Sequence, residues 1–288
     1  MFVSGFTFIR NAVKLDYPVK EAILSVLPLV DEMVVAVGLS EDTTRDLILS
    51  LGPKIRIIDT VWDDSLREGG KVLASETNKA FDAVDKDADW CVYIQGDECI
   101  HEKHHGEILA AMDKYANDDR VDGLLFNYSH FYGSYDYLGD SRTWYRKEIR
   151  VIKNDKEIRS YRDAQGFRKN NRKLNVKATG AEMYHYGWVR HPKYQMAKLV
   201  EANKLWHDDD YIAKKFNSEE DFDYSEIDSI RPFEGTHPKV MHSRISEINW
   251  SFDKDPSVKS FGPKLRFLYL VEKLTGWRIG EYKNYKLI

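Results

Sequence analysis

In the first hundred residues, short apolar runs alternate with segments whose apolar residues recur at the spacing of a helix. The apolar runs predict four strands, at residues 2–9, 33–37, 55–58 and 90–94. Apolar residues three or four positions apart predict the helices between them, at residues 19–27, 45–51 and 71–84. Strands and helices that alternate at this rhythm favour a parallel sheet with helices on both faces.

The pattern becomes less regular after residue 101. It predicts helices at residues 102–115, 192–205 and 263–274, and strands at residues 123–128, 149–153 and 183–189. Neither an internal repeat nor a low-complexity linker divides the chain. We therefore expect one continuous domain with an α/β half at residues 1–120 and a mixed half at residues 121–288.

Composition narrows the class of protein. Hydrophobic residues make up 42% of the chain, and the net charge of −4 argues against generic binding of nucleic acid. No run of 18 apolar residues predicts a membrane-spanning helix, and the chain does not start with the basic segment of a secretory signal. Two cysteines, Cys91 and Cys99, are too few for a disulfide framework. A reducing cytoplasm fits these features best.

Candidate chemistry is concentrated where the strand at residues 90–94 ends. The next four residues are Gln95, Gly96, Asp97 and Glu98. A buried strand that delivers acids to its carboxyl end presents a ligand site in open α/β sheets. Asp97 and Glu98 could hold a hard divalent cation, and such a cation could hold phosphate oxygens. The alternative interpretation is an ordinary solvated turn.

The order of several motifs along the chain is informative. The first strand ends in the pair Arg10-Asn11, and the phrase SVLPLVDE follows at residues 25–32. A polar turn follows the second strand at residues 39–44, and Asn78 lies in the helix that precedes the acidic strand end. This order resembles the family-2-type glycosyltransferases of the A-type fold. The similarity covers residues 2–115, and its specificity lies in the order of the motifs, because each motif alone is common.

The resemblance implies a Rossmann-like α/β fold with a mostly parallel central sheet flanked by helices and a mixed α+β C-terminal portion. Residues 1–120 would bind a nucleoside diphosphate sugar, and residues 121–288 would bind the acceptor. The residues implied in nucleotide-sugar binding are Phe8, Arg10, Asn11, Gly38, Ser40, Asp42, Lys71, Asn78, Gln95, Gly96, Asp97 and Arg190.

The resemblance also implies a metal ion. Asp97 would bind the Mg²⁺ or Mn²⁺ that bridges the two phosphates and stabilises the departing nucleoside diphosphate. Two positions depart from the family pattern. Val37 stands where a base-reading acid is usual, and Gln95 replaces the first acid of the metal motif. Gln95 can hydrogen-bond a hydroxyl group but adds no charge.

Two further roles fall in the second half of the chain. Related transferases supply a late histidine as a metal ligand, and His185 is the first candidate, with His191 second. The alternative for His185 is a core histidine in an aromatic strand. Asp163 is the candidate for the base that removes the proton from the acceptor hydroxyl. Its alternative is an ordinary surface salt bridge.

A competing motif begins at His101. The sequence from His101 through Glu102 to His105 fits the H-E-x-x-H pattern of zinc metallopeptidases. The motif starts a helix instead of lying inside an apolar one, and Ile108 and Ala111 occupy the places of the extended pattern. A zinc metallopeptidase is therefore a lesser alternative, and a sugar-nucleotide-binding protein without transfer activity is another.

These observations favour a cytoplasmic, metal-dependent, inverting glycosyltransferase. Its acceptor would be a glycan or glycolipid, such as a surface glycan or a lipopolysaccharide component. The amphipathic helix at residues 263–274, with basic residues Lys264, Arg266, Lys273 and Arg278 in and after it, is interpreted as a packing helix. Peripheral contact with the inner membrane face or with a second subunit is the alternative for this helix.

Overall fold

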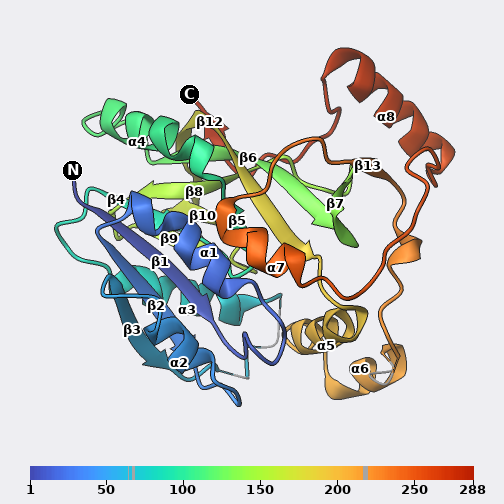
Figure 1. The fold of residues 1–288 in the computed structure, drawn as a ribbon. Helices are drawn as coiled ribbons and strands as arrows, with labels where there is room; N and C mark the ends of the chain where they lie inside the picture. The colour runs from blue at the N-terminus through green and yellow to red at the C-terminus, as the bar shows by residue number, and fades with distance from the viewer. Residues whose placement is uncertain (64, 67–68, 217–219) are drawn as a thin grey trace.

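The structure is a computed structural model that describes residues 1–63, 65–66, 69–216 and 220–288. In this part of the chain, eleven strands form one central sheet and three form a small second sheet. The central sheet runs in the order β13-β7-β6-β8-β4-β1-β2-β3, and β12 crosses it to join β5, β6 and β14. Figure 1 shows that strands from both halves of the chain belong to this sheet.

The N-terminal part of the central sheet is parallel, as predicted. Its strands are β1 (Val3–Ile9), β2 (Glu32–Gly38), β3 (Ile55–Thr60) and β4 (Trp90–Tyr93). The helices that accompany them are α1 (Val19–Val26), α2 (Thr44–Leu49), α3 (Lys71–Asp82) and α4 (His105–Lys114). Short 3₁₀ turns extend α1 and precede α4, at η1 (Leu27–Leu29) and η2 (Glu102–His104).

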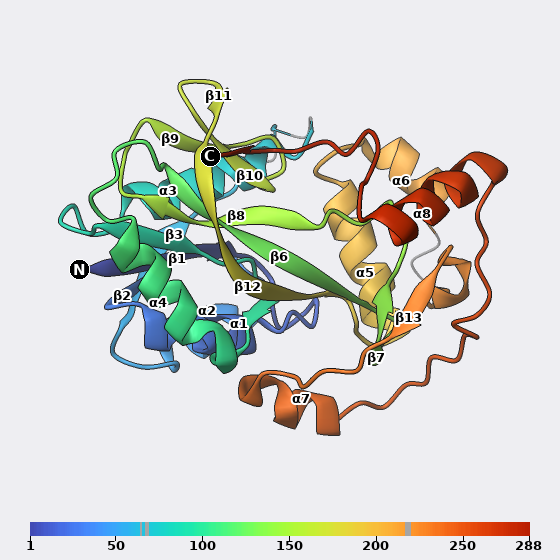
Figure 2. The same cartoon turned by 90° about the horizontal axis from the view of Figure 1, so that it is seen from above.

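Two apolar cores lie on opposite faces of this sheet. Residues of α1 and α4 pack with one set of strand side chains, including Val35 and Val92. Residues of α3 pack with the other set, including Phe6 and Tyr93. Figure 2 shows α1 and α4 on one side of the sheet and α3 on the other. The expected α/β class is confirmed, with the sheet becoming mixed after β4.

The second half of the chain extends the sheet with antiparallel strands. These are β6 (Gly123–Tyr132), β7 (Ser134–Gly139), β8 (Lys147–Lys153) and β13 (Ile230–Pro232). Three short strands build the small sheet, namely β9 (Ile158–Tyr161), β10 (Gly166–Lys169) and β11 (Arg172–Lys173). The remaining helices are α5 (Pro192–Asn203), α6 (Asp209–Lys215), α7 (His242–Ser246) and α8 (Pro263–Thr275), with 3₁₀ turns η3 (Tyr224–Glu226) and η4 (Lys239–Met241).

The long strand β12 (Asn175–Trp188) begins eight positions before the strand predicted at residues 183–189. Its first residues pair with β14 (Lys286–Leu287) and alternate between buried and exposed positions. They therefore lack the apolar run from which the later part of the strand was predicted. Its later residues pair antiparallel with β5 (Glu98–Ile100) and parallel with β6. This strand therefore joins the acidic strand end to the second half of the sheet.

The register of β12 brings the distant histidines to the acidic strand end. His185 lies opposite Glu98 in β5 and opposite His130 in β6. Because residues opposite each other in register point to the same face of a sheet, both imidazole rings lie beside the turn that carries Asp97.

The remaining sequence predictions about the fold concern the two cysteines, membrane-spanning helices and the helix near the C-terminus. Cys91 and Cys99 are both buried thiols without a disulfide between them. Among the helices of the described residues, none combines the length and the apolar character that crossing a membrane requires. The helix predicted at residues 263–274 is α8, and none of its residues is fully buried.

Candidate functional site

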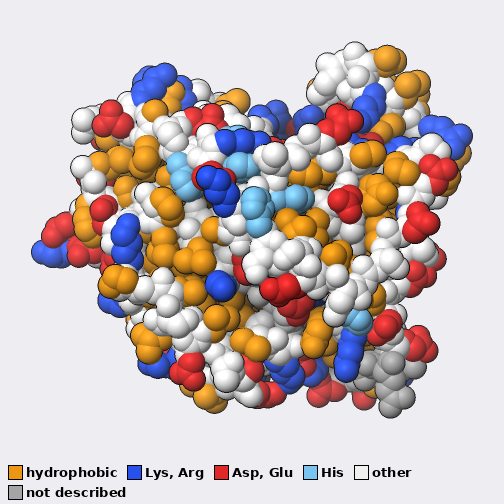
Figure 3. Space-filling view, in the orientation of Figure 1, with side chains coloured by type: hydrophobic (Ala, Val, Ile, Leu, Met, Phe, Trp, Pro, Cys, Tyr) orange, Lys and Arg blue, Asp and Glu red, His pale blue; other side chains and the backbone are white. Residues whose placement is uncertain are grey.

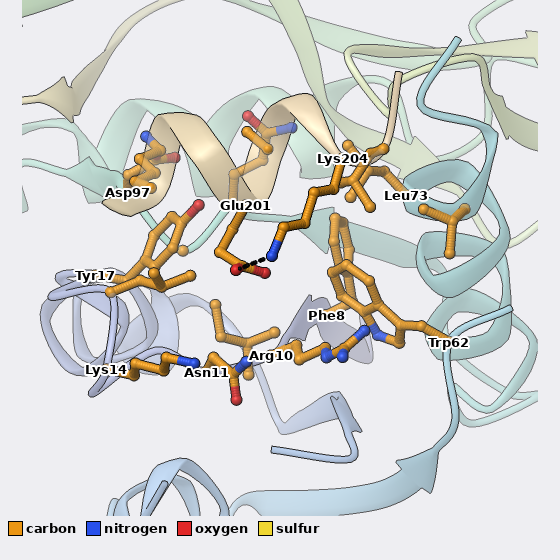
Figure 4. A pocket seen from close by; sticks show the side chains of 18 of the residues that line it. Phe8, Arg10, Asn11, Lys14, Tyr17, Trp62, Leu73, Asp97, Glu201 and Lys204 are labelled. Carbon is orange, nitrogen blue, oxygen red and sulfur yellow. Dashed lines mark hydrogen bonds and ion pairs between the residues drawn. The ribbon is translucent and has the colours of Figure 1, made fainter. Parts of the chain in front are cut away.

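A cavity of about 550 Å³ opens at the carboxyl ends of β1 and β4. Side chains from β1, from the turn after β4 and from α5 line it, as Figure 4 shows. Six of the predicted nucleotide-sugar residues are in this lining, namely Phe8, Arg10, Asn11, Gln95, Gly96 and Asp97. The position agrees with the general placement of ligand sites in open α/β sheets.

One end of the cavity is aromatic. The rings of Phe8 and Trp62 lie 5.9 Å apart between centroids, and the Arg10 guanidinium lies 5.4 Å from the Trp62 ring centroid. Gly38 makes room for this arrangement, because a Cβ atom there would come within 2.4 Å of the Trp62 indole nitrogen. Flat rings and a guanidinium of this kind provide stacking surfaces for a nucleobase.

The Arg-Asn motif after β1 has a structural role in addition to its place in the lining. Asn11 adopts a left-handed backbone with φ of 53°, which Asn tolerates better than most residues. Its backbone N–H donates to the Ser40 hydroxyl at 3.0 Å, and its side-chain oxygen accepts from the Glu41 N–H at 2.8 Å. These bonds fasten the end of β1 to the turn after β2.

The other end of the cavity carries Asp97, which is 8% exposed. One carboxylate oxygen, Oδ2, accepts a hydrogen bond from Lys198 on α5 at 2.9 Å, and Lys198 also donates to the Gly187 carbonyl at 2.8 Å. Burial opposes ionisation of Asp97, but the cations Lys198 and Arg190 together with His185 hold the pKa of its carboxyl well below the usual range. Asp97 is therefore a carboxylate at neutral pH.

The second oxygen of Asp97 faces a histidine. Oδ1 lies 3.7 Å from His185 Nε2, and His185 Nδ1 lies 2.9 Å from Nδ1 of His130. His130 Nε2 lies 2.7 Å from the Tyr145 carbonyl and so must carry the proton that is donated to it. Burial lowers the pKa of His130 to about 3 and also lowers the pKa of His185, so both rings are neutral at pH 7.

This chain of bonds fixes the tautomers. Neutral His130 has its proton on Nε2, so its Nδ1 accepts, and His185 must donate from Nδ1. His185 Nε2 then carries a lone pair and no proton, and it lies 3.7 Å from Asp97 Oδ1. Two proton-free acceptors that face each other are a suitable pair of ligands for a cation.

The donor set fits the divalent ion that the resemblance implies. An imidazole nitrogen and a carboxylate oxygen are ligands that Mn²⁺ accepts, and two ligands of one ion lie roughly 3–4 Å apart. Gly187 leaves space here, since a Cβ would come within 2.5 Å of His185 Nε2 and 3.1 Å of Asp97 Oδ2. Within the described residues, no group of three or more His, Cys, Asp and Glu side chains could hold a metal. An ion bound by Asp97 and His185 would therefore complete its coordination with water or with oxygen atoms of a substrate.

Glu98, the other acid of the strand end, is not a metal ligand. It is fully buried, and Arg150 binds both of its oxygens, at 2.7 and 2.8 Å. The Tyr128 hydroxyl and the Gln95 N–H donate to the same carboxylate. The suggestion that Glu98 shares a cation with Asp97 is therefore wrong, because its carboxylate already has four donors.

Several predicted residues lie outside the described lining of the cavity. Gly38 leaves space for the Trp62 ring, and the Ser40 hydroxyl accepts a hydrogen bond from Asn11, so both support residues of the lining. Asp42 accepts from the N–H groups of Lys14 and Thr44, and thereby holds the turn before α2. Lys71 is the first residue of α3 and is likewise outside the lining.

Asn78 and Arg190 are held by other parts of the protein. The Asn78 side-chain amide forms two hydrogen bonds with the backbone of Ser160, at 2.9 and 3.1 Å, and so clamps α3 to β9. Arg190 is fully buried, donates to the Leu15 carbonyl at 2.9 Å and lies 4.7 Å from the Tyr17 ring centroid. Its contribution to the site is electrostatic, through the pKa of Asp97.

Asp163 is half-buried and packs against Gly70 at the start of α3. It is not among the described residues that line the cavity. The neighbouring wall residue is Leu205, whose carbonyl accepts from the Gly70 N–H at 3.4 Å. Asp163 thus lies next to Gly70, which in turn contacts this part of the wall.

The histidines of the zinc motif bind different partners. His101 Nε2 lies 2.9 Å from the Thr236 hydroxyl, and His105 Nε2 lies 3.0 Å from the Ser25 carbonyl. Figure 3 shows histidine side chains gathered on one face of the molecule, but within the described residues no group of three or more His, Cys, Asp and Glu side chains could hold a metal. The zinc peptidase alternative is contradicted by these bonds. His191 accepts from the Lys193 N–H and caps α5.

Four important residues were missed in the sequence. Trp62 follows the end of β3, and the rule that parallel strands end at one edge could have identified it. Tyr17, His130 and Lys198 depend on the turn after β1, on the register of β6 and β12, and on the position of α5. No local sequence signal marks these three.

Comparison with known proteins gives only distant similarities. No protein-family model matches the sequence, and no curated protein matches it. Among solved structures, residues 1–349 of S. aureus TarS are 13% identical, with a TM-score of 0.42 over 70% of this chain and 64% of that chain. The same fragment in complex with UDP is 14% identical with the same TM-score, over 69% of this chain and 64% of that chain.

A second similarity is to glucosyl-3-phosphoglycerate synthase from Mycobacterium tuberculosis, in complex with Mn²⁺, UDP and phosphoglyceric acid. It is 18% identical, with a TM-score of 0.30 over 46% of this chain and 43% of that chain. The chain thus spans less than two thirds of the length of these proteins. Similarity at this level does not establish a shared activity, so the chemistry of the site rests on its geometry.

Proposed function

We propose that this protein transfers a sugar from a nucleoside diphosphate sugar to an acceptor hydroxyl. The observation that carries the proposal is Asp97, which lines one end of a cavity whose other end is aromatic and whose Oδ1 lies 3.7 Å from Nε2 of His185, a residue outside the described lining. A cation held by this pair would have room for phosphate oxygens, and the base of the same nucleotide would stack on Phe8 or Trp62. The order of motifs in residues 2–115 supports the same class.

The chain's own residues suit the departure of a diphosphate. Lys14, Lys198 and Lys204 line the cavity, and each is paired in the structure with an acid, namely Glu41, Asp97 and Glu201. A bound diphosphate would compete for these ammonium groups. When bound, Mn²⁺ or Mg²⁺ would neutralise the charge that develops on the leaving group. Lys14 would provide the same stabilisation from the segment after β1, and Lys198 and Lys204 would provide it from α5 and its C-terminal end.

We propose an inverting transfer to a glycan or glycolipid acceptor. Such a transfer needs a base that removes the proton of the attacking hydroxyl. Asp163 is the candidate from the sequence, and Glu201 on α5 is the acid that the second half of the chain contributes to the described lining. Substitution of each by its amide distinguishes them, because loss of the base leaves donor binding intact and removes transfer.

The first experiment is a thermal-shift screen of UDP, GDP, CDP, dTDP and their sugars, with and without Mn²⁺. A ligand that binds the folded state raises the melting temperature. We expect a metal-dependent shift with one nucleotide and a loss of roughly 5- to 150-fold in its affinity in Trp62→Ala, from the 1–3 kcal/mol that base stacking contributes. Trp277→Ala, at an exposed tryptophan outside the cavity, is the matched control. Absence of a shift with every nucleotide would contradict the proposal.

A sugar-nucleotide-binding protein without transfer activity is the second candidate. Lys198 already neutralises one oxygen of Asp97, and Gln95 brings no charge of its own. Such a site could hold a nucleotide sugar without breaking it. Release of free nucleoside diphosphate from the bound donor, dependent on Mn²⁺, would favour the transferase.

A further inference from the structure

Helix α8 turns its polar side chains toward the protein. The Tyr269 hydroxyl donates to Asp140, and Glu272 binds Arg142 at 2.6 Å and Arg278 at 2.9 Å. Lys273 also reaches Asp140, at 3.1 Å. The helix is therefore attached to the body mainly through hydrogen bonds and ion pairs, in contrast to an ordinary surface helix, which buries its apolar face.

The opposite face of α8 is apolar and exposed. Phe267, Leu270 and Leu274 are 64%, 54% and 76% exposed, and their spacing of three and four places them on one side of the helix. Trp277, just after the helix, is 65% exposed. Figures 1 and 2 both show α8 at the edge of the molecule, with no described element covering its outer side.

A hollow lies along this face. Its volume is about 390 Å³, and it is lined by Phe261, Pro263, Arg266, Phe267 and Leu270. Together with Leu274 and Trp277, these residues form what we term the α8 apolar face. Contiguous exposed apolar surface of this kind is typical of an interaction site.

The charge around the α8 apolar face has one sign. Lys264 and Arg266 flank it, whereas Glu272 points inward to Arg142 and Arg278, and Lys273 is paired with Asp140 of the body. The whole chain has a net charge of −4, so this concentration of basic groups is local. Apolar residues bordered by lysine and arginine, with a tryptophan at one end, are the pattern of helices that lie in the interface of an anionic membrane.

The same charges argue against a second copy of the chain as the occupant. In a two-fold symmetric dimer the same face would meet itself, so the flanking basic residues of the two copies would approach one another. Like charges across an interface oppose association. An anionic lipid surface, by contrast, complements these groups and accepts the apolar side chains between them.

We propose that the α8 apolar face docks onto a membrane surface that contains anionic lipids, with Phe267, Leu270, Leu274 and Trp277 inserted among the headgroups. This inference does not depend on the proposed transferase activity. The polar attachment of α8 to the body keeps the helix in place while its apolar side enters the lipid.

Co-sedimentation with lipid vesicles tests this proposal. We expect the protein to sediment with vesicles of phosphatidylcholine and phosphatidylglycerol, and less with vesicles of phosphatidylcholine alone. Leu274→Glu and Phe267→Glu should each lower the partition coefficient roughly 10- to 100-fold, because each removes a buried apolar side chain from the lipid. Arg266→Glu should lower it several-fold through charge.

The matched control is Leu49→Glu, since Leu49 is 57% exposed on α2, away from α8. It should leave binding unchanged. Circular dichroism should show that all of these exposed substitutions leave the fold intact. Equal binding by Leu274→Glu and the parent, or no binding to anionic vesicles, would overturn the proposal. A concentration-dependent dimer that Leu274→Glu abolishes would identify a second copy as the occupant instead.

Discussion

The two sides of the turn after β4 differ sharply although they are adjacent in sequence. On the cavity side, Asp97 has one oxygen on Lys198 and the other facing the lone pair of His185. On the core side, Glu98 is fully buried and its carboxylate has four hydrogen-bond donors. Asp97 lies in the turn itself and Glu98 is the first residue of β5, so one acid can serve binding and the next can serve stability.

Substitution of the two acids should therefore change different quantities, namely stability for Glu98 and binding and turnover for Asp97. Glu98 and Arg150 form a pair in which neither charge has access to water, so removal of one member leaves the other uncompensated. Asp97 lies at a surface that a ligand can reach, so its substitution should reduce ligand binding and turnover. The predictions below separate the two quantities.

The largest expected effect is on stability. Glu98→Gln should lower the free energy of unfolding by about 3–5 kcal/mol, because it leaves Arg150 as a buried, unpaired cation. Urea unfolding measures this change. The exposed Glu41→Gln, which breaks a surface pair with Lys14, should change stability by less than about 1 kcal/mol. Equal effects of the two substitutions would show that Glu98 is not a structural acid.

The next effect is on turnover. Asp97→Asn should reduce kcat/KM roughly 100- to 1,000-fold, the range found when one group that stabilises transition-state charge is removed. Its Mn²⁺ affinity should fall as well, while urea unfolding should change less than in Glu98→Gln. Asp63→Asn, at an acid in the aromatic end of the cavity, is the matched control. Full turnover in Asp97→Asn would remove Asp97 from the site.

A smaller effect tests the positioning of His185. His130→Phe removes the acceptor that fixes the His185 tautomer, so Mn²⁺ affinity should fall by roughly 10- to 100-fold. Electron paramagnetic resonance of Mn²⁺ measures this without turnover. His191→Gln should leave Mn²⁺ affinity unchanged, since His191 caps α5. A loss in His191→Gln and none in His130→Phe would reverse the two assignments.

The sequence predicts the cavity side of the first half well, for a physical reason. Strand ends and helix starts there are set by local apolar spacing, and parallel strands bring their carboxyl ends to one edge. Asp97 was found in this way, and Phe8 and Arg10 were predicted from the resemblance; all three line the cavity.

The residues on the core side of the turn after β4, and those in the second half of the chain, are positioned by contacts between segments far apart in the sequence. His130 meets His185 only through the register of β6 and β12, and Glu98 meets Arg150 across 52 positions. Asn78 clamps β9 because the basic segment folds into a small sheet, which its composition did not indicate. Local periodicity contains no information on such pairings, so the roles predicted for Asn78 and His185 rested on resemblance, and the metal role predicted for Glu98 rested on its position at a strand end.

The last prediction concerns the pH dependence of stability and a third acid on the core side. Glu148 lies two positions before Arg150, and burial raises the pKa of its carboxyl to about 7, although Arg150 and Asn284 oppose the shift. The folded protein therefore holds this proton up to about pH 7, whereas the unfolded chain releases it near the ordinary value of 4.5. The unfolding free energy should consequently fall as the pH rises from about 4.5 to 7, by roughly 3 kcal/mol. Urea unfolding at several pH values measures the slope, and Glu148→Gln should flatten it. An unchanged slope in that variant would assign the pH dependence to another group, and would leave Glu98 as the acid that defines the core side of the turn.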